Sequence, residues 1–221
     1  MTFHLAPHMS YGVFGTRAVL LDLVTDRYLL LGEAEAAALA ALAKPDPSAS
    51  PALVNALLAR RIIVEGAGSV IAPVDQPRPL ASALETLDGG GGVSTLEASL
   101  SCIRAILSIR TMGLARTIMR ARAFRRRCER RRDGRLVTDS GRAAFFARGF
   151  AEARIGVPLP RRCVPDSLAL ARCLWNRGIA ADVFFGVQLD PLLAHAWVQI
   201  DDVVLSDPLN IAADYCPVFR L

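Results

Sequence analysis

The chain has 221 residues, of which 52% are hydrophobic, enough to bury the core of one domain or of two. Its start lacks a basic segment followed by an apolar run, and no window holds about 18 uninterrupted apolar residues. We therefore expect neither a signal peptide nor a membrane-spanning helix. Five cysteines without CxxC spacing and only three histidines argue against a zinc site, and no metal or other cofactor is expected. Unpaired thiols suit a reducing cytoplasm.

Residues 1–80 have the pattern of a small α+β domain. Short strands are predicted at 3–9, 18–24 and 28–31. One helix is predicted over 33–43, ending at 44–48, and a second begins at Ser50-Pro51 and runs to 61. A hairpin is predicted at 62–72 around Gly66-Ala67-Gly68. Strands, helices and a terminal hairpin are typical of a winged-helix module.

A winged-helix module can bind DNA, but this one carries a net charge of −1 over residues 1–80, which opposes phosphate binding. An exposed sheet edge, with the helix at 51–60 beside it, is better suited to an extended peptide that adds as a further strand. A purely structural role is the remaining alternative. No nucleic-acid partner is expected.

Proline- and glycine-rich segments divide the chain. PVDQPRP at 73–79 and DGGGGVST at 88–95 indicate a linker, so the expected division is a domain at 1–80, a linker at 81–95 and a second domain at 96–221. Beyond the linker a helix starts at Ser94 or Thr95, with apolar residues at helical spacing at 96, 100, 103 and 107.

The positive charge is concentrated in the middle of the chain. The formal net charge is +5, yet residues 104–148 alone carry fourteen arginines against three acids. Most of them fall in the segment 116–135, which overlaps a second predicted helix over 114–132. A solvated helix face is the expected role of these arginines. Contact with an acidic peptide or partner protein, and contact with nucleic acid, are the alternatives.

A thiol, an imidazole and a carboxylate follow one another in the C-terminal part of the chain, as in cysteine hydrolases and acyltransferases. Cys163 stands just before Pro165 and Asp166 at a predicted helix start, with Pro165 at about the first helical position. Unpaired backbone N–H groups and the positive helix end lower a thiol pKa there. Arg161 and Arg162 add positive charge. Cys163 is therefore the candidate nucleophile.

His195 lies in a predicted strand, LLAHAWVQI, on the same face as Trp197 and Gln199. A lone histidine on a strand is usually structural, but here an acid can be placed opposite it. If residues 200–202 form a three-residue loop, Gln199 pairs with Val203 and His195 faces Asp207, with Cβ atoms about 4.5–5.5 Å apart. A two-residue loop would break this alignment. Weaker candidates for the acid are Asp190, Asp201, Asp202 and Asn210.

The run CVPDSLALARCLWNRGIAADVFFGV, followed by AHAWVQI and VVLSD, closely resembles the C-terminal domain of lasso-peptide B proteins. These are leader peptidases with a transglutaminase-like, papain-related fold. On the family motif, Cys163 matches the nucleophile, His195 the general base and Asp207 the orienting acid. GTRAVLLDLVTDRYLLLG and EAEAAALAALA resemble the leader-recognition domain of such systems, a winged-helix relative of a pyrroloquinoline-quinone biosynthesis chaperone. The chain thus resembles the fused form of the B protein.

The resemblance implies an α+β protein with a winged-helix-like peptide-recognition domain joined to a cysteine peptidase domain. It implies cytoplasmic cleavage of a ribosomally made lasso-peptide precursor between leader and core, and handover of the core to an ATP-dependent, asparagine-synthetase-like cyclase. The leader is expected to add as a strand along 27–31, with the helix at 51–60 as the other wall. The expected leader contacts are Arg27, Tyr28, Leu29, Leu30, Leu31, Val54, Leu57, Leu58 and Arg61.

Two alternatives share this sequence evidence. One is a transglutaminase-like acyltransferase with the same three residues, in which an amine rather than water would resolve the thioester. The other is a non-catalytic escort that binds the leader through an inactive peptidase fold.

Overall fold

The computed structural model describes residues 2–44, 49–86 and 88–221, and the chain divides into two compact units. The first unit comprises Met1–Asp75 with Cys216–Phe219, and the second comprises Gln76–Tyr215 with Arg220–Leu221. The boundary therefore falls a few residues before the predicted one at 80. The predicted helix end at 45–48 and residue 87 of the predicted linker lie outside the described residues.

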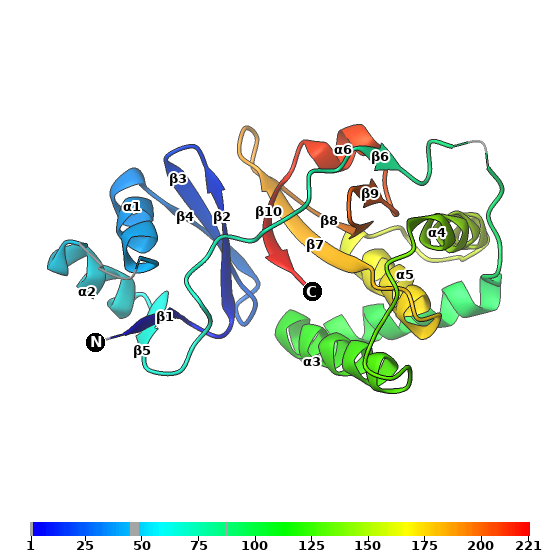
Figure 1. The fold of residues 1–221 in the computed structure, drawn as a ribbon, viewed down its shortest axis with the longest axis horizontal. Coiled ribbons are helices and arrows are strands. Elements are labelled where there is room, and N and C mark those ends of the chain that lie inside the picture. The colour runs from blue at the N-terminus through cyan, green and yellow to red at the C-terminus, as the bar shows by residue number, and fades with distance from the viewer. Residues whose placement is uncertain (1, 45–48, 87) are drawn as a thin grey trace. The chain divides into compact units, whose positions relative to one another are not determined.

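A three-stranded antiparallel sheet and two helices build the first unit (Figure 1). The strands run in the order β2 (Met9–Phe14), β3 (Arg17–Asp22) and β4 (Arg27–Leu31). Helix α1 (Glu33–Leu42) packs against β3 and β4, whereas α2 (Pro51–Ala59) packs against α1 and β5. Their shared core is mostly aliphatic and includes Leu20, Leu31, Leu39, Leu57 and Ile62. Strand β4 therefore forms one edge of this sheet.

The predicted hairpin at 62–72 is wrong. Its turn is present, but β5 (Ile63–Glu65) pairs with β1 (Phe3–Leu5), and Ser69 exchanges backbone hydrogen bonds with Leu5. Strand β1 thus lies between the two segments that were expected to pair with each other in the hairpin. Gly68 permits this, because a Cβ there would lie 2.6 Å from the Leu5 carbonyl oxygen. The sequence pattern also does not predict β2, and the winged-helix arrangement is not confirmed.

A five-stranded sheet with helices packed against it supplies the strands of the second unit (Figure 1), although Cys216–Phe219 of its edge strand β10 are grouped with the first unit. The strand order is β10 (Cys216–Arg220), β7 (Asp182–Gln188), β8 (Leu193–Ile200), β9 (Val203–Val204) and β6 (Ala81–Ser82). Helix α5 (Cys163–Asn176) packs on β7 and β8, and α4 (Ser140–Ile155) packs on α5. A short helix, α6 (Leu209–Ala213), precedes β10. Because β6 pairs in parallel with β9, residues 81–82 belong to this sheet and not to a linker.

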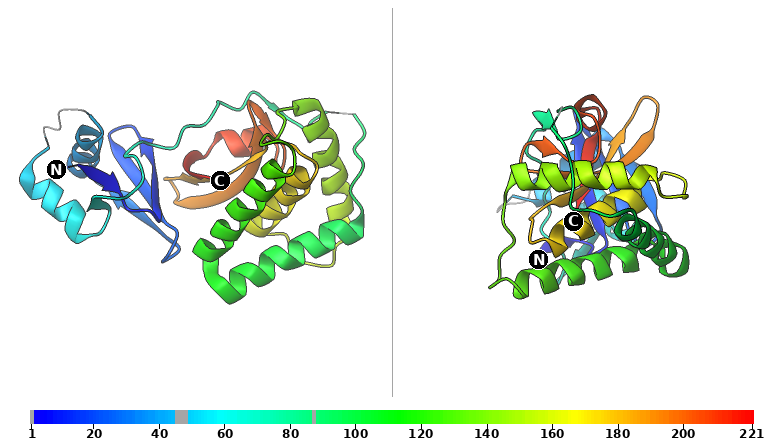
Figure 2. Two further views of the ribbon diagram at one scale, coloured as in Figure 1. Left: turned by 60° about the horizontal axis from the view of Figure 1, so that its bottom comes forward. Right: turned by 90° about the vertical axis from the view of Figure 1, so that its right-hand side faces the viewer.

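Helix α3 (Thr95–Arg130) is bent rather than continuous. Gly113 has φ 76° and ψ 173°, far from helical values, so residues 95–112 and 114–130 form two helical arms. Helix α3 packs against α5 (Figure 2). The sequence predicts a separation into two helices at this glycine, and the bend confirms it.

The apolar stripe that the sequence displays on the first arm is exposed, not buried. Leu96, Leu100, Ile103 and Leu107 are 69%, 50%, 40% and 54% exposed, while the buried side chains of this arm are the smaller Ala98, Cys102 and Ala105. Among the described helices, α3 is the one that is long and apolar enough to cross a membrane by length and composition alone. Its small buried residues instead pack against α5.

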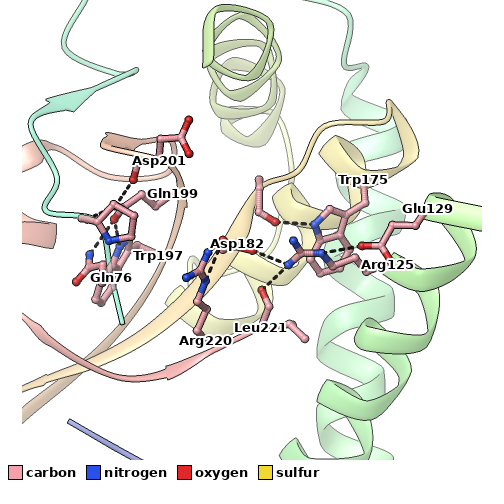
Figure 3. A network of polar contacts seen from close by, with 12 residues as sticks. Gln76, Arg125, Glu129, Trp175, Asp182, Trp197, Gln199, Asp201, Arg220 and Leu221 are labelled. Carbon is pink, nitrogen blue, oxygen red and sulfur yellow. Dashed lines mark hydrogen bonds and ion pairs between the residues drawn. The ribbon is translucent and has the colours of Figure 1, made fainter. Parts of the chain in front are cut away.

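Two groups of polar contacts lie at the end of the sheet where β7 begins and β8 ends (Figure 3). Arg125 of α3 donates from Nη1 to Asp182 Oδ1 at 2.6 Å and to the Leu221 carbonyl at 3.0 Å, and Arg220 donates to Asp182 Oδ2 at 2.6 Å. These bonds join α3 to β7 and to the last residue of the chain.

The second group surrounds Gln199, which is 1% exposed near the end of β8. Its Oε1 accepts from Trp197 Nε1 and Gln76 Nε2, and its Nε2 donates to the carbonyls of Pro77 and Asp201 at 2.6 Å each. The segment that enters the second unit and the β8–β9 loop are thus both held to the end of β8.

Gly113→Ala is expected to destabilise the second unit by about 1–3 kcal/mol, because a residue with a Cβ is strained in this backbone conformation. A new Cβ would meet nothing within 4 Å, so the loss would come from the backbone and not from a clash. Urea unfolding followed by circular dichroism measures the change. The matched control is Gly141→Ala in the first turn of α4, where a Cβ has room, and it should leave stability unchanged or slightly higher. Unaltered stability of Gly113→Ala would contradict the bend.

Candidate active site

Cys163 is the first residue of helix α5, directly after the N-cap Arg162. The helix begins two residues earlier than Pro165 predicts, and this proline falls in the first turn, where its missing N–H removes no intrahelical hydrogen bond. The thiol is exposed. The backbone N–H of Cys163 has no acceptor within the helix, so the helix start places a free donor and the positive dipole end beside an accessible sulfur.

One turn further along α5, Ser167 is bonded to the strand that carries His195. Its hydroxyl, only 2% exposed, donates to the carbonyl oxygen of Ala196 at 2.9 Å. Ser167 lies on the same helix face as Cys163, four residues away, and Ala196 is the neighbour of His195. This hydrogen bond therefore sets the position of the thiol along β8. The sequence gives no signal for Ser167, because a serine inside a helix has many possible roles.

His195 and Asp207 meet as predicted: His195 Nε2 lies 3.0 Å from Asp207 Oδ1. The predicted loop, however, is wrong. Gln199 pairs with Val204, so the loop has two residues instead of three. Continued as a regular ladder, this register would place Asp207 opposite Ala196, one residue away from its observed partner.

The regular pairing of β8 with β9 ends before Asp207, and this restores the contact between Asp207 and His195. The N–H of Leu205 still donates to the Val198 carbonyl at 2.8 Å, but the Val198 N–H donates to the Ser206 hydroxyl at 2.8 Å instead of to a backbone carbonyl. The chain bends there and carries Asp207 to the imidazole. Ser206 Oγ also donates to Asp207 Oδ2, and Ser82 Oγ of β6 donates to the Asp207 backbone carbonyl at 2.7 Å. The acid is thus held through both its side chain and its backbone.

The weaker acid candidates lie elsewhere. Asp190 and Asp201 occupy turns next to β8, and Asp201 has a positive φ of 47°. Asn210 lies exposed in α6. Within the described residues, Asp207 is the acid bonded to His195.

Two aromatic rings border the imidazole. Trp197 stacks with His195 at a centroid distance of 6.3 Å, and Tyr215 lies tilted at 5.2 Å. Trp197 is fixed in turn by its hydrogen bond to Gln199. The sequence predicts that His195 and Trp197 share a face, but it gives no indication of Tyr215, which comes from the segment before β10.

The electrostatics favour a thiolate facing an imidazolium. Desolvation by itself would raise the pKa of the Cys163 thiol, but hydrogen bonds with His195 and with the Ala196 and Val164 backbones outweigh it, so the pKa is lowered. Desolvation would lower the pKa of His195, yet its hydrogen bonds with Asp207 and Cys163 raise that pKa to about 9. Because Nε2 is taken by the carboxylate, Nδ1 is the ring nitrogen left for the thiol.

A pocket of about 240 Å³ opens over these residues. Cys163, His195 and Asp207 lie at its wall together with the apolar side chains of Leu84, Ala147, Phe150, Ala151, Leu170 and Leu205. Its polar lining also includes Arg154, Arg161, Arg162, Asp166, Ser167 and Ser206. Among the described residues no group of three or more histidine, cysteine or acidic side chains is arranged to hold a metal ion. The pocket therefore offers a reactive sulfur beside an apolar cavity.

A buried ion pair supports the entrance of α5. Arg154 is 3% exposed and donates from Nε to Asp166 Oδ1 at 3.1 Å, while its other nitrogens donate to the carbonyls of Val157, Leu159 and Pro160. The extended segment before Cys163 is thus tied to α4 and to the first turn of α5. Removing Asp166 would leave the buried charge of Arg154 without its anionic partner.

The residues expected to bind the leader belong to the first unit and fall into two groups. Leu31 and Leu57 are fully buried in its core, so their side chains pack there and are closed to a peptide. Leu30 is 51% exposed on the edge strand β4. Side chains that are partly or fully exposed are those of Arg27, Tyr28, Leu29, Val54, Leu58 and Arg61. The helix that packs against β4 is α1, whereas the expected wall, α2, packs against α1 and β5.

A helix-borne thiol, a strand-borne imidazole and an acid that orients it define the class of thiol hydrolases and acyltransferases. A family model described as the transglutaminase-like superfamily matches residues 106–220, just over half of the chain and all three of these residues. The chain belongs to the transglutaminase-like superfamily. Comparisons with curated proteins and with solved structures found no significant match.

Alkylation of Cys163 by iodoacetamide should remain fast at neutral pH, because the thiolate is already formed below the ordinary thiol pKa. His195→Ala removes the stabilising imidazolium and should slow alkylation at pH 7 by about tenfold or more, with Asp207→Ala intermediate. Mass spectrometry of the modified peptide measures the rate.

Turnover should fall as pH rises through about 9, where the imidazolium loses its proton.

The control for the alkylation experiment is Cys216, which is half-buried and whose thiol pKa is raised by burial. Its alkylation should be slow at neutral pH in all three proteins. Equal alkylation rates of Cys163 in the wild type and His195→Ala would exclude the ion pair.

Proposed function

We propose that this protein is a cysteine peptidase that binds the leader of a ribosomally made lasso-peptide precursor and cleaves between leader and core. The observation that carries the proposal is the hydrogen-bonded pair of His195 and Asp207 beside an exposed thiol at a helix start. The second support is an edge strand, β4, in a separate compact unit. Its sequence resembles a leader-recognition domain, and the C-terminal run resembles a leader peptidase.

In the proposed reaction the Cys163 thiolate attacks the carbonyl carbon of the scissile peptide bond. The resulting oxyanion accepts a hydrogen bond from the free backbone N–H of Cys163. His195 gives its proton to the leaving amine of the core peptide, and the C–N bond breaks to leave a thioester. His195 then takes a proton from water, and the hydroxide attacks the thioester carbonyl; the C–S bond breaks, which releases the leader with a new carboxylate and restores the thiolate beside the imidazolium.

The peptide-binding unit would contribute through local concentration. A leader that adds as a strand to β4 would use backbone hydrogen bonds for affinity and the exposed Leu30 with its neighbours for specificity. Since the linked second unit carries the thiol, binding at β4 makes attack on the scissile bond effectively intramolecular. The released core would pass to an ATP-dependent, asparagine-synthetase-like cyclase in the cytoplasm.

The direct test uses the peptide encoded by a short open reading frame beside this gene, incubated with the purified full chain in H₂¹⁸O. We expect two fragments, the leader fragment carrying one ¹⁸O atom in its new carboxylate by mass spectrometry. Cys163→Ala should abolish cleavage while still binding the precursor. Cys216→Ala is the control thiol variant and should cleave normally. Unchanged processing by Cys163→Ala would favour a non-catalytic escort, and a product joined to an added amine without ¹⁸O would favour an acyltransferase.

Leader binding is tested separately from chemistry. Leu30→Asp should raise KM for the full precursor about tenfold or more with little change in kcat, because it removes binding shared by ground and transition states. Val24→Asp changes another exposed side chain of the first unit that lies outside β4 and should have no effect. Equal KM values for wild type and Leu30→Asp would remove β4 as the leader site.

A further inference from the structure

The first arm of α3 presents an apolar stripe that is largely open to solvent. Leu96, Leu100, Ile103 and Leu107 are each at least 40% exposed. At 100° per residue their directions fall within a band about 60° wide, so they form one continuous row along the helix. The opposite face is occupied by the small residues that pack on α5. A row of four exposed aliphatic side chains marks an interaction surface.

A groove runs beside this row and is lined by arginines. One part of it, about 410 Å³, is lined by Leu96, Leu100 and Arg104 of the first arm, Phe124 of the second arm and Arg172 of α5. A second part, about 350 Å³, shares Arg104 and Arg172 and adds Arg120. Three residues with hydroxyl groups, Ser101, Ser108 and Thr117, also line this second part.

No carboxylate among the described residues forms an ion pair with Arg104, Arg120 or Arg172. Glu97 borders the groove, but both of its oxygens are bonded to Arg177. The guanidinium of Arg172 lies 3.6 Å from the centroid of the Phe124 ring, which fixes its position. Three guanidinium groups therefore line one groove, and their N–H groups can donate hydrogen bonds to carboxylates of a bound partner.

We propose that this face, the row of Leu96, Leu100, Ile103 and Leu107 with the groove of Arg104, Arg120 and Arg172, docks an acidic, amphipathic segment of a partner protein. Aliphatic side chains of the segment cover the row, and its carboxylates enter the groove and pair with the arginines. The surface lies apart from the pocket at Cys163, since the two share none of their lining residues.

Two other occupants fit the surface less well. A second copy of this chain would bring arginines against arginines, which is repulsive. An anionic membrane also attracts a basic amphipathic helix, but a bilayer surface is flat and would not fill a groove that lies between α5 and the two arms of α3. Concavity and charge together favour a protein segment with projecting acids.

The test selects binders from a phage-displayed library of random peptides on the full-length protein, with Leu100→Ser/Arg104→Glu as the counter-selection target. We expect peptides rich in acids, with apolar residues three and four apart. Fluorescence anisotropy should show that these peptides bind the double variant at least about tenfold more weakly. The matched control is Leu80→Ser/Arg142→Glu, which alters an exposed leucine and an exposed arginine away from the groove and should bind as the wild type does.

Several results would overturn the proposal. These are enrichment of no peptide specific to the wild type, enrichment of basic peptides, and equal binding by the double variant. Vesicles of phosphatidylcholine and phosphatidylglycerol that bind the wild type but not the double variant, without peptide selection, would assign the face to a membrane. Sedimentation that shows self-association lost in the double variant would assign it to a second copy. Cleavage of the precursor by the double variant should be intact, which separates this proposal from the peptidase.

Discussion

The hydrogen bond between the Ser167 hydroxyl and the Ala196 carbonyl is the constraint on which the site depends. It joins helix α5 to strand β8 one turn after Cys163 and one residue after His195. Without it, the polar contacts reported between the two elements would be those of the reacting thiol itself, with His195 and the Ala196 backbone, and the rest of the contact would be packing, which is not directional. Because the bond is buried and directional, the two reacting groups keep one relative position, as catalysis by proximity requires.

The acid is positioned by a comparable device. A regular hairpin with a two-residue loop would leave Asp207 one residue out of place, and Ser206 corrects this by replacing a backbone carbonyl as the acceptor for Val198. Ser82 then holds the Asp207 backbone from the neighbouring strand. The resulting carboxylate keeps the imidazole charged, which in turn favours the thiolate.

The sequence predicts the three residues at the site but not how they come together. Thiol, imidazole and acid are rare enough here to be found by residue type and by resemblance. The register error shows that strand pairing near a loop depends on side-chain hydrogen bonds, which periodicity does not encode. Likewise, the spacing of Leu96 and Leu100 predicts a helix but not which face is buried, because the small residues that allow close packing give little hydrophobic signal. The pairing of β1 with β5 and of β6 with β9 is similarly a long-range choice, invisible in local pattern.

The central claim is a charged imidazole at His195 held by Asp207 and facing the Cys163 sulfur. NMR of the ring nitrogens in ¹⁵N-histidine-labelled protein tests it most directly, since the chain has only three histidines. The account predicts that His195 is protonated on both nitrogens at neutral pH and titrates at about 9, with a lower pKa in Cys163→Ser. A His195 ring that is neutral at neutral pH and titrates near the ordinary value of about 6.5 would contradict it.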